Sequence, residues 1–494
     1  MLLSDHDPEY QLAALSQALL ANNAVLAIYD DYYVGAVPFH LTEQRYAEVY
    51  RRLQREARPK WGKLVVISAA QRLAVEGFLT HGQTEPDEDI WAAFVDNGLD
   101  LTQHEVHLDA TLFGRAYISA WPTVDGSGIR CVPESPYEVI HWRSPDRTQE
   151  VALKMWPEED VWRARVYTAN DIFAYVAPRN TSLVEDPLSL NANRTARGER
   201  ELISPNNMAA SAPTWQQDGP AMPNPFAPYL PIVPFVAGSR GDVLGRSDLE
   251  SALDIIDRIM ALQLDLLLVS KIMGFPVRWA TGIEVPENDE QKAMVTAVER
   301  FLTTDNPDAN FGQLPAADLR QINSVISSTV TELAAVTETP SSVLATANLA
   351  NPVSAEALRA QEIPLVHRVL RHQRAFGPSW VKVARLLALE LAGTVEVLWA
   401  DAEVHSEAAL TDALVKQVVS LEVPREAAWE QLPDTTPATV ARWRTMRAAQ
   451  NMEDQLAAAL LQPPGAQPPT QTVGSPSPAA APTPQQQAQE AAPT

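Results

Sequence analysis

The first half of the chain changes its hydrophobic period once. Up to residue 113 apolar residues recur every three to four positions, which predicts helices at 10–20, 41–58, 89–96 and 101–113. An apolar segment at 61–80 ends in a short strand near 75–78. Between 116 and 177 the period shortens towards two, and turn residues separate the runs, which predicts an antiparallel β-rich region. Residues 178–230 are rich in Pro, Asn and Ser, which favours a long surface excursion.

Long helical patterns dominate after residue 238. Ser247 and Glu250 have the spacing of a capping box, in which each side chain satisfies a free backbone N–H, so a helix is expected from there to Met273. Its second half is apolar nearly all round, and such a helix must be covered by protein on every side. A neighbouring subunit is the expected cover for Leu262, Leu266, Val269 and Met273.

The rest of the chain continues this helical character. A small module at 274–315 combines a strand-like stretch with a helix at 290–302, and helices are expected at 317–336 and 354–391. Pro364 and Gly377-Pro378 interrupt the last of these, so we expect bends there, because proline removes a helical hydrogen bond. A strand at 394–399 and helices at 407–421, 424–431 and 437–461 follow.

The helical and β-rich segments together predict an α+β protein, and its length favours two or three domains. With 494 residues, 46% of them hydrophobic, the chain is long for one core. Cys131 is the single cysteine, which excludes an intramolecular disulfide. The first residues lack a signal peptide pattern and five polar residues interrupt 255–273, so neither a leader nor a membrane helix is expected. Residues 462–494 contain nine Pro and one charge, and we expect them to be disordered.

The charge limits the ways in which the chain can meet nucleic acid. A net charge of −24 argues against binding over the general surface, because such binding needs Lys and Arg, but it permits DNA to slide past. The helix at 354–390 is a local exception, with six cations against three anions. We expect these cations at subunit contacts or facing a polyanion in a channel: Arg359, Arg368, Arg371, Arg374, Lys382 and Arg385.

No enzyme signature stands out. The chain contains no P-loop, no HExxH and no GxSxG motif. His104 and His107 have the spacing of a minimal metal pair but no third ligand nearby, and a polar helix face explains them better. Asp401 and Glu403 are expected to be solvated. We therefore predict no enzyme, no cofactor and no metal; a cofactor-free hydrolase built on residues 116–177 is the alternative of the enzyme class.

Several ordered segments together resemble the portal proteins of tailed bacteriophages, in particular those of siphophages and actinobacteriophages. They are Gln71–Phe78, Leu244–Ile259, Met273–Gly282, Glu338–Glu362, Val395–Val418 and Val423–Pro433. The resemblance implies a ring, commonly of twelve copies, at one capsid vertex of the virion, assembled in the host cytoplasm. Double-stranded DNA would pass through it during packaging and ejection. The implied partners are the terminase large subunit, the head–tail connector, the major capsid protein and scaffold, with no membrane.

The resemblance also assigns segments and residues by position. It implies a wing at 1–240, stem helices at 241–273 and 316–338, a clip at 274–315 and a tunnel loop at 339–353. A kinked helix with a wing strand at 354–402, a crown at 403–461 and the tail complete the chain. The uncharged tunnel loop would lie near DNA through Thr339, Ser341, Ser342, Thr346, Asn348 and Asn351. The clip would offer a docking surface through Arg278, Trp279, Lys292 and Arg300. Another ring-forming head–tail protein, or the portal of a defective prophage or gene-transfer particle, is the alternative.

Overall fold

The computed structural model describes most of the chain, in two compact units, Met1–Glu403 and Val404–Thr494. The described residues are 3, 7–37, 56–57, 60–80, 86–126, 128–158, 161–178, 214–239, 244–273, 278–281, 308, 310–313, 318–344, 355–388, 393–403, 407–420, 424–429 and 437–460. The mixture of helices and strands confirms the α+β class.

The N-terminal helix α1 (Pro8–Val34) is longer than the pattern at 10–20 predicts. Pro8 favours its start, and Gly35 ends it in the left-handed conformation that glycine adopts without strain. By length and composition α1 is also apolar enough to cross a bilayer, the one such helix among the described residues. Part of that apolar surface is a core face, because Leu12, Leu15 and Leu19 pack against a β-sheet. Most of the helix predicted at 41–58 lies outside the described residues.

Strand β1 (Val75–Thr80) comes next after helix α3 (Trp61–Ala70). It is followed by helices α4 (Glu88–Asp96) and α5 (Leu99–Phe113). The predicted β-rich region follows and forms two antiparallel sheets. One sheet has the order β10-β2-β3, from Ile232–Val236, Arg115–Pro122 and Ile129–Glu134. The other has the order β4-β5-β6-β7-β8, with β9 also paired to β7. Its strands are Val139–Arg143, Glu150–Glu158, Val161–Tyr167, Asp171–Pro178, Gln216–Gln217 and Met222–Pro223.

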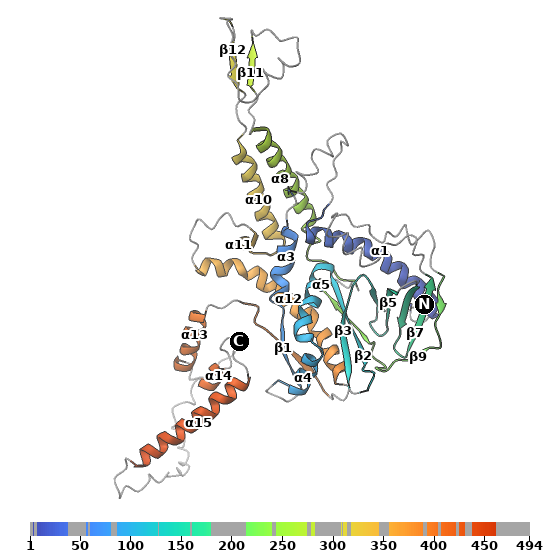
Figure 1. Ribbon diagram of the computed structural model, residues 1–494. Coiled ribbons are helices and arrows are strands. Elements are labelled where there is room, and N and C mark those ends of the chain that lie inside the picture. Colours follow the sequence, from blue (N-terminus) through green and yellow to red (C-terminus); the bar gives the residue numbers. More distant parts are fainter. Residues whose placement is uncertain are drawn as a thin grey trace, which may run out of the picture. The chain divides into compact units, whose positions relative to one another are not determined.

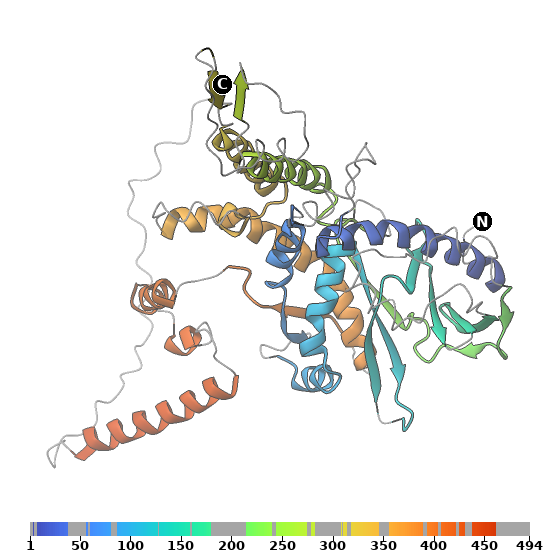
Figure 2. The same ribbon diagram turned by 45° about the horizontal axis from the view of Figure 1, so that its top comes forward.

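Two long helices, α8 (Leu253–Met273) and α10 (Leu319–Val336), lie side by side and form an arm (Figures 1 and 2). They are antiparallel, because Ile256 near the start of α8 packs in the same core as Leu333 near the end of α10. Strands β11 (Arg278–Thr281) and β12 (Asn310–Gln313) pair antiparallel in the connection between them. The helix predicted at 290–302 lies outside the described residues.

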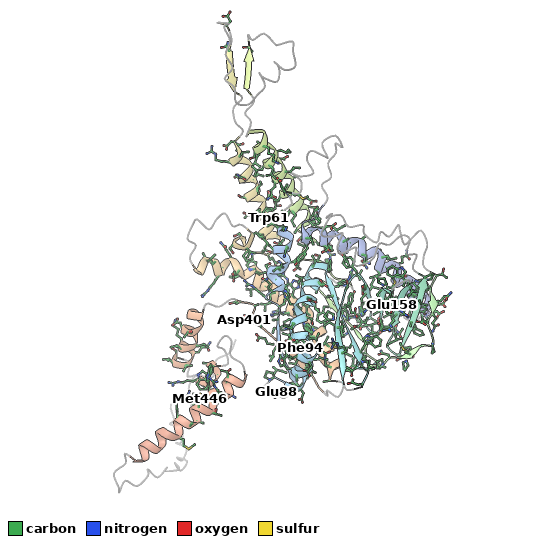
Figure 3. All side chains as sticks on the ribbon, viewed as in Figure 1. Trp61, Glu88, Phe94, Glu158, Asp401 and Met446 are labelled. Atoms are coloured by element: carbon green, nitrogen blue, oxygen red, sulfur yellow. The ribbon has the colours of Figure 1, made fainter. Side chains whose placement is uncertain are left out.

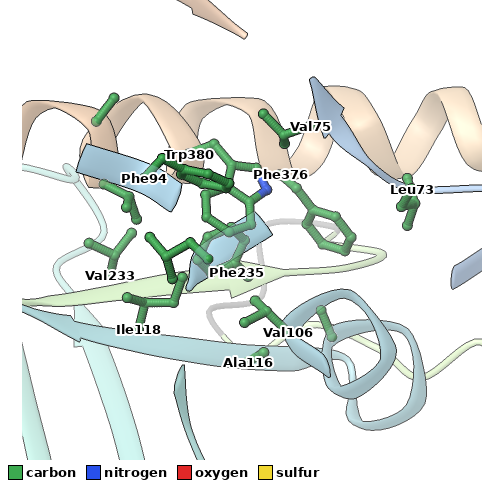
Figure 4. Packing of buried hydrophobic residues seen from close by; sticks show 14 of the residues in the cluster. Leu73, Val75, Phe94, Val106, Ala116, Ile118, Val233, Phe235, Phe376 and Trp380 are labelled. Carbon is green, nitrogen blue, oxygen red and sulfur yellow. The ribbon is translucent and has the colours of Figure 1, made fainter. Parts of the chain in front are cut away.

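Helix α12 (Ala355–Leu387) is continuous through Pro364 and Pro378 and runs through the middle of the first unit. Strand β13 (Val395–Trp399) follows it and pairs antiparallel with β1, more than 300 residues earlier in the chain. The main hydrophobic core lies between α12 and the strands, where Trp380, Phe376 and Phe94 meet Phe235 and Ile118 (Figure 4). This core fixes α12 against the rest of its unit.

The second unit is helical where it is described. Its helices α13 (Glu407–Ser420), α14 (Arg425–Trp429) and α15 (Pro437–Leu460) agree with the predicted ones to within a few residues. The rings of Trp429 and Trp443 meet edge to face with centroids 6.0 Å apart, which joins α14 to α15. Exposed side chains such as Met446 on α15 contrast with buried Phe94 in the core of the first unit (Figure 3).

Candidate channel and subunit-contact sites

Most of the cations predicted on α12 are at least partly exposed. Arg359, Arg371 and Arg374 lie on the surface. Arg371 forms an ion pair with Glu338, which follows α10. Lys382 lies 3.3 Å from a carboxylate oxygen of Glu150, and Arg385, like Lys382, lines a cavity of about 610 Å³ between the end of α12 and the loops of the larger sheet. Their predicted contacts with a channel or a neighbouring subunit stay predictions.

Arg368 is a correction, because its guanidinium is buried and occupied within its own chain. Nε and Nη2 donate to one carboxylate oxygen of Asp248 at 2.9 and 2.6 Å. Nη1 donates to the carbonyl oxygen of Thr337 at 2.9 Å, and Nη2 donates to that of Val65 at 2.9 Å. A side chain held in this way has no donor left for DNA or for a second subunit.

Thr339 is the second correction, since it is buried at the end of the arm instead of lining an open loop. Its hydroxyl oxygen accepts from Arg368 Nη1 at 3.3 Å and contacts the hydroxyl of Thr337 at 3.0 Å. Ser341 and Ser342 lie in the short helix α11 (Ser341–Leu344), half-buried and exposed respectively. Thr346, Asn348 and Asn351 are outside the described residues.

The segment before α8 explains how Asp248 reaches Arg368. Gly245 has a φ of +69°, and a Cβ there would lie 2.6 Å from the carbonyl oxygen of Ala237 and closer still to that of Gly114. Gly114 has a φ of +79° and leaves equally little room for a side chain beside Arg246. The same two backbone segments are also joined by a hydrogen bond, which the Asp248 N–H donates to the carbonyl oxygen of Thr111 at 3.0 Å. Only glycine fits both positions.

The predicted capping box is therefore wrong. Ser247 Oγ accepts from the N–H of Leu249 at 3.0 Å within a turn, and α8 begins only at Leu253. A motif that resembled a helix start in the sequence instead forms a turn that places Asp248 beside Arg368. The sequence could not reveal this role of Asp248, because its partners Arg368 and His372 are about 120 residues away.

His372 completes the cluster with Arg368, which is buried as it is, and Asp248, which is partly buried. Its Nε2 lies 2.9 Å from the same Asp248 oxygen, one helical turn beyond Arg368. Burial opposes ionisation of Asp248, but Arg368 and His372 outweigh it and hold the pKa of the carboxyl well below its usual range. The three residues line one side of an open cavity of about 470 Å³, together with Arg371, Arg374 and Glu338. The cluster thus lies at the base of this cavity, with basic side chains at its exposed edge.

The side chains predicted to pack between subunits lie along the arm. Leu262, Leu266 and Val269 are half-buried within one chain, whereas the neighbouring Leu264 is buried against Ala57. Met273 ends α8, and its side chain is not among those that the structure describes. Among the predicted docking residues, Arg278 and Trp279 belong to β11 without described side chains, and Lys292 and Arg300 fall outside the described residues.

The residues considered as metal ligands or catalytic groups instead make contacts within the fold. His107 is fully buried, contacts Trp380 and Leu73 and does not converge with exposed His104. Asp401 accepts from the N–H of Glu403 at 2.9 Å in an exposed turn. Within the described part of the chain, no three His, Cys, Asp or Glu side chains come together as a metal site.

Comparison with known proteins places these features in a family. The family model "Phage portal protein, SPP1 Gp6-like" matches residues 26–453. The chain is 28% identical over 398 residues to the portal protein of Mycobacterium phage D29, and 26% identical over 400 residues to that of Mycobacterium phage L5. Each match covers 74% of this chain and 74% of the relative. This chain belongs to the SPP1 Gp6-like family of phage portal proteins.

Proposed function

We propose that this portal protein forms a ring-shaped channel at one vertex of the capsid, through which double-stranded DNA passes during packaging and ejection. The observation that carries the proposal is the family match over residues 26–453, which includes both helices of the arm, α12 and part of the second unit. The protein supplies a passage and a docking platform, and a separate motor performs the chemistry.

The ring consists of about twelve copies related by cyclic symmetry, in which one face of each copy meets a different face of the next. Exposed apolar side chains on the arm and the adjoining part of α12 support such contacts, because they gain stability only when another surface covers them. They are Val325 and Val336 on α10 and Leu358 and Ile363 on α12. The half-buried Leu262, Leu266 and Val269 would pack between neighbouring arms.

The segments take the roles of a portal subunit. Residues 1–240 form the wing, α8 and α10 the stem, 274–315 the clip and 403–461 the crown. The loop at 339–353 approaches the DNA through Ser341, Ser342, Thr346, Asn348 and Asn351. Its lack of charge suits passage, because each cationic contact with a phosphate would hold the DNA and increase friction at low salt.

Partners bind at opposite ends of this arrangement. The clip, through Arg278, Trp279, Lys292 and Arg300, docks first the terminase large subunit and later the head–tail connector. The wing meets the major capsid protein and scaffold during assembly in the host cytoplasm, and the mature ring stays in the virion. The exposed cations Arg359, Arg371 and Arg374 lie at subunit contacts, where they neutralise part of the acidic balance of −24.

Labelling of intact particles tests the location. A gold-conjugated antibody against the second unit, applied to gently opened particles, should mark a single vertex in electron micrographs. Particles assembled without the protein should contain no DNA. Labels at many vertices, or full particles without the protein, would refute the proposal.

A further inference from the structure

We propose that Asp248, Arg368 and His372, together with Thr337 and Thr339, form a rigid joint that makes α12, α3 and the base of the arm move as one body. The inference rests on the proposed function, because it concerns how force on the DNA-conducting arm reaches the rest of the subunit. The joint assigns Arg368 a positioning role within the chain.

The joint connects four segments that are far apart in sequence. Arg368 belongs to α12, Val65 to α3, Asp248 to the turn before α8, and Thr337 to the turn after α10. One guanidinium therefore holds both ends of the arm's base at once. The five contacts of Arg368 span 2.6 to 3.3 Å and include both backbone and side-chain acceptors.

The chemistry of arginine makes this connection stiff. Its planar guanidinium presents donors in a fixed fork, so the acceptors on all four segments must keep one relative geometry. Displacing any segment would break charge-assisted hydrogen bonds of a guanidinium that is almost fully buried. His372 adds a second donor to the same Asp248 oxygen and restrains the carboxylate further.

Backbone packing also holds the turn that carries Asp248 in place. The crossing of Gly245 over Gly114 leaves no room for a Cβ, so the turn that carries Asp248 is fixed against the end of α5. Beyond the joint the restraints decrease. Residues 358–361 of α12, before Pro364, are exposed, and the half of α8 after Leu264 is only partly buried. Bending is therefore confined to these outer parts, and the base stays intact.

Hydrogen–deuterium exchange on the assembled full-length protein tests the joint, with Arg368→Lys as the variant. Lysine keeps the charge beside Asp248 but cannot reach Val65 and Thr337 together. Exchange at amides 249–252, 333–339 and 66–70 should rise together by about tenfold or more, while strands β5 and β6 keep their protection. Arg163→Lys is the matched control, because Arg163 pairs with Glu158 and Asp218 on the surface of the larger sheet, away from the joint. It should leave all these rates unchanged.

Other exchange patterns would overturn the proposal. Faster exchange restricted to α12 would mean that the segments are not coupled, and a uniform rise including β5 and β6 would mean a general loss of stability. If Arg368→Lys weakens folding too far, the double variant Asp248→Leu with Arg368→Met removes the buried charges together, a change that folds often tolerate. It should show the same combined rise.

A packaging assay connects the joint to function. Wild-type protein and both lysine variants are supplied to cells infected with phage lacking its own portal, and the DNA in purified particles is measured. We expect Arg368→Lys to form rings but to lower the packaged DNA at least severalfold, while Arg163→Lys packages normally. Normal packaging by Arg368→Lys would overturn the joint. Failure of the wild-type chain to form rings would instead contradict the proposed function.

Discussion

The indole Nε1 of Trp380 donates a hydrogen bond to Nε2 of His107 at 2.9 Å, in the centre of the main core. Because indole nitrogen only donates, Nε2 must be the acceptor, and the ring proton of His107 lies on Nδ1. Nδ1 then donates to the carbonyl oxygen of Leu73 at 3.0 Å. One neutral imidazole thus connects α12, α5 and the turn before β1.

This arrangement predicts a pH dependence of stability. Burial lowers the pKa of His107 to about 3. The unfolded chain takes up a proton near pH 6.5, whereas the native chain does not until about pH 3, so native stability falls as the pH decreases through this window. His141, whose pKa burial also lowers, contributes in the same direction.

Guanidinium unfolding at pH 7 and pH 5 measures the effect. In His107→Gln the loss of unfolding free energy between the two pH values should be about 2 kcal/mol smaller than in the wild type, at about 1.4 kcal/mol per pH unit below 6.5. His104→Gln, a change at the exposed histidine of the same helix, should leave the loss unchanged. An equal loss in wild type and His107→Gln would show that the pKa of His107 is not lowered in the native state.

Gly245→Ala should destabilise the fold severely. The new Cβ would overlap the carbonyl oxygens of Gly114 and Ala237 and would occupy a left-handed conformation, which together should cost roughly 3 kcal/mol or more. Gly126→Ala is the control, because Gly126 has a φ of +71° but open space around it, and should cost only about 1 kcal/mol. Thermal unfolding of both variants compares them; equal costs would mean that the crossing is not close.

Two substitutions on α10 separate packing within a subunit from packing between subunits. Leu333 is fully buried at the base of the arm, and Leu333→Ala should lower the unfolding free energy of the isolated chain by about 2–5 kcal/mol. Val325 is 50% exposed in one chain, so Val325→Ala should change that energy by less than about 0.5 kcal/mol. It should nevertheless shift the ring towards free subunits in sedimentation at low concentration. No shift would place Val325 outside the subunit contact.

The sequence alone predicted elements with local signals. The periodicity at 354–391 located α12 to within a few residues, and the alternation at 116–177 identified the β-rich region. The pairing of β1 with β13 could not be predicted, because it joins segments more than 300 residues apart through backbone groups that carry no side-chain signature.

The candidate site was predictable only in its exposed part. Charge counting located the cations of α12, but nothing local to Arg368 shows that its acceptors come from residues 65, 248 and 337. The Ser247–Glu250 spacing led to a wrong helix start for the same reason. The backbone before α8 crosses close to Gly114, a contact that the sequence does not reveal, and α8 begins only at Leu253.

Negative-stain electron microscopy with a solution mass of the purified protein tests the central claim most directly. The account predicts rings with a central hole and a mass of roughly 600–700 kDa, as about twelve chains of 54.2 kDa in closed cyclic symmetry require. A chain that remains a compact monomer, even when capsid and scaffold proteins are added, would contradict it.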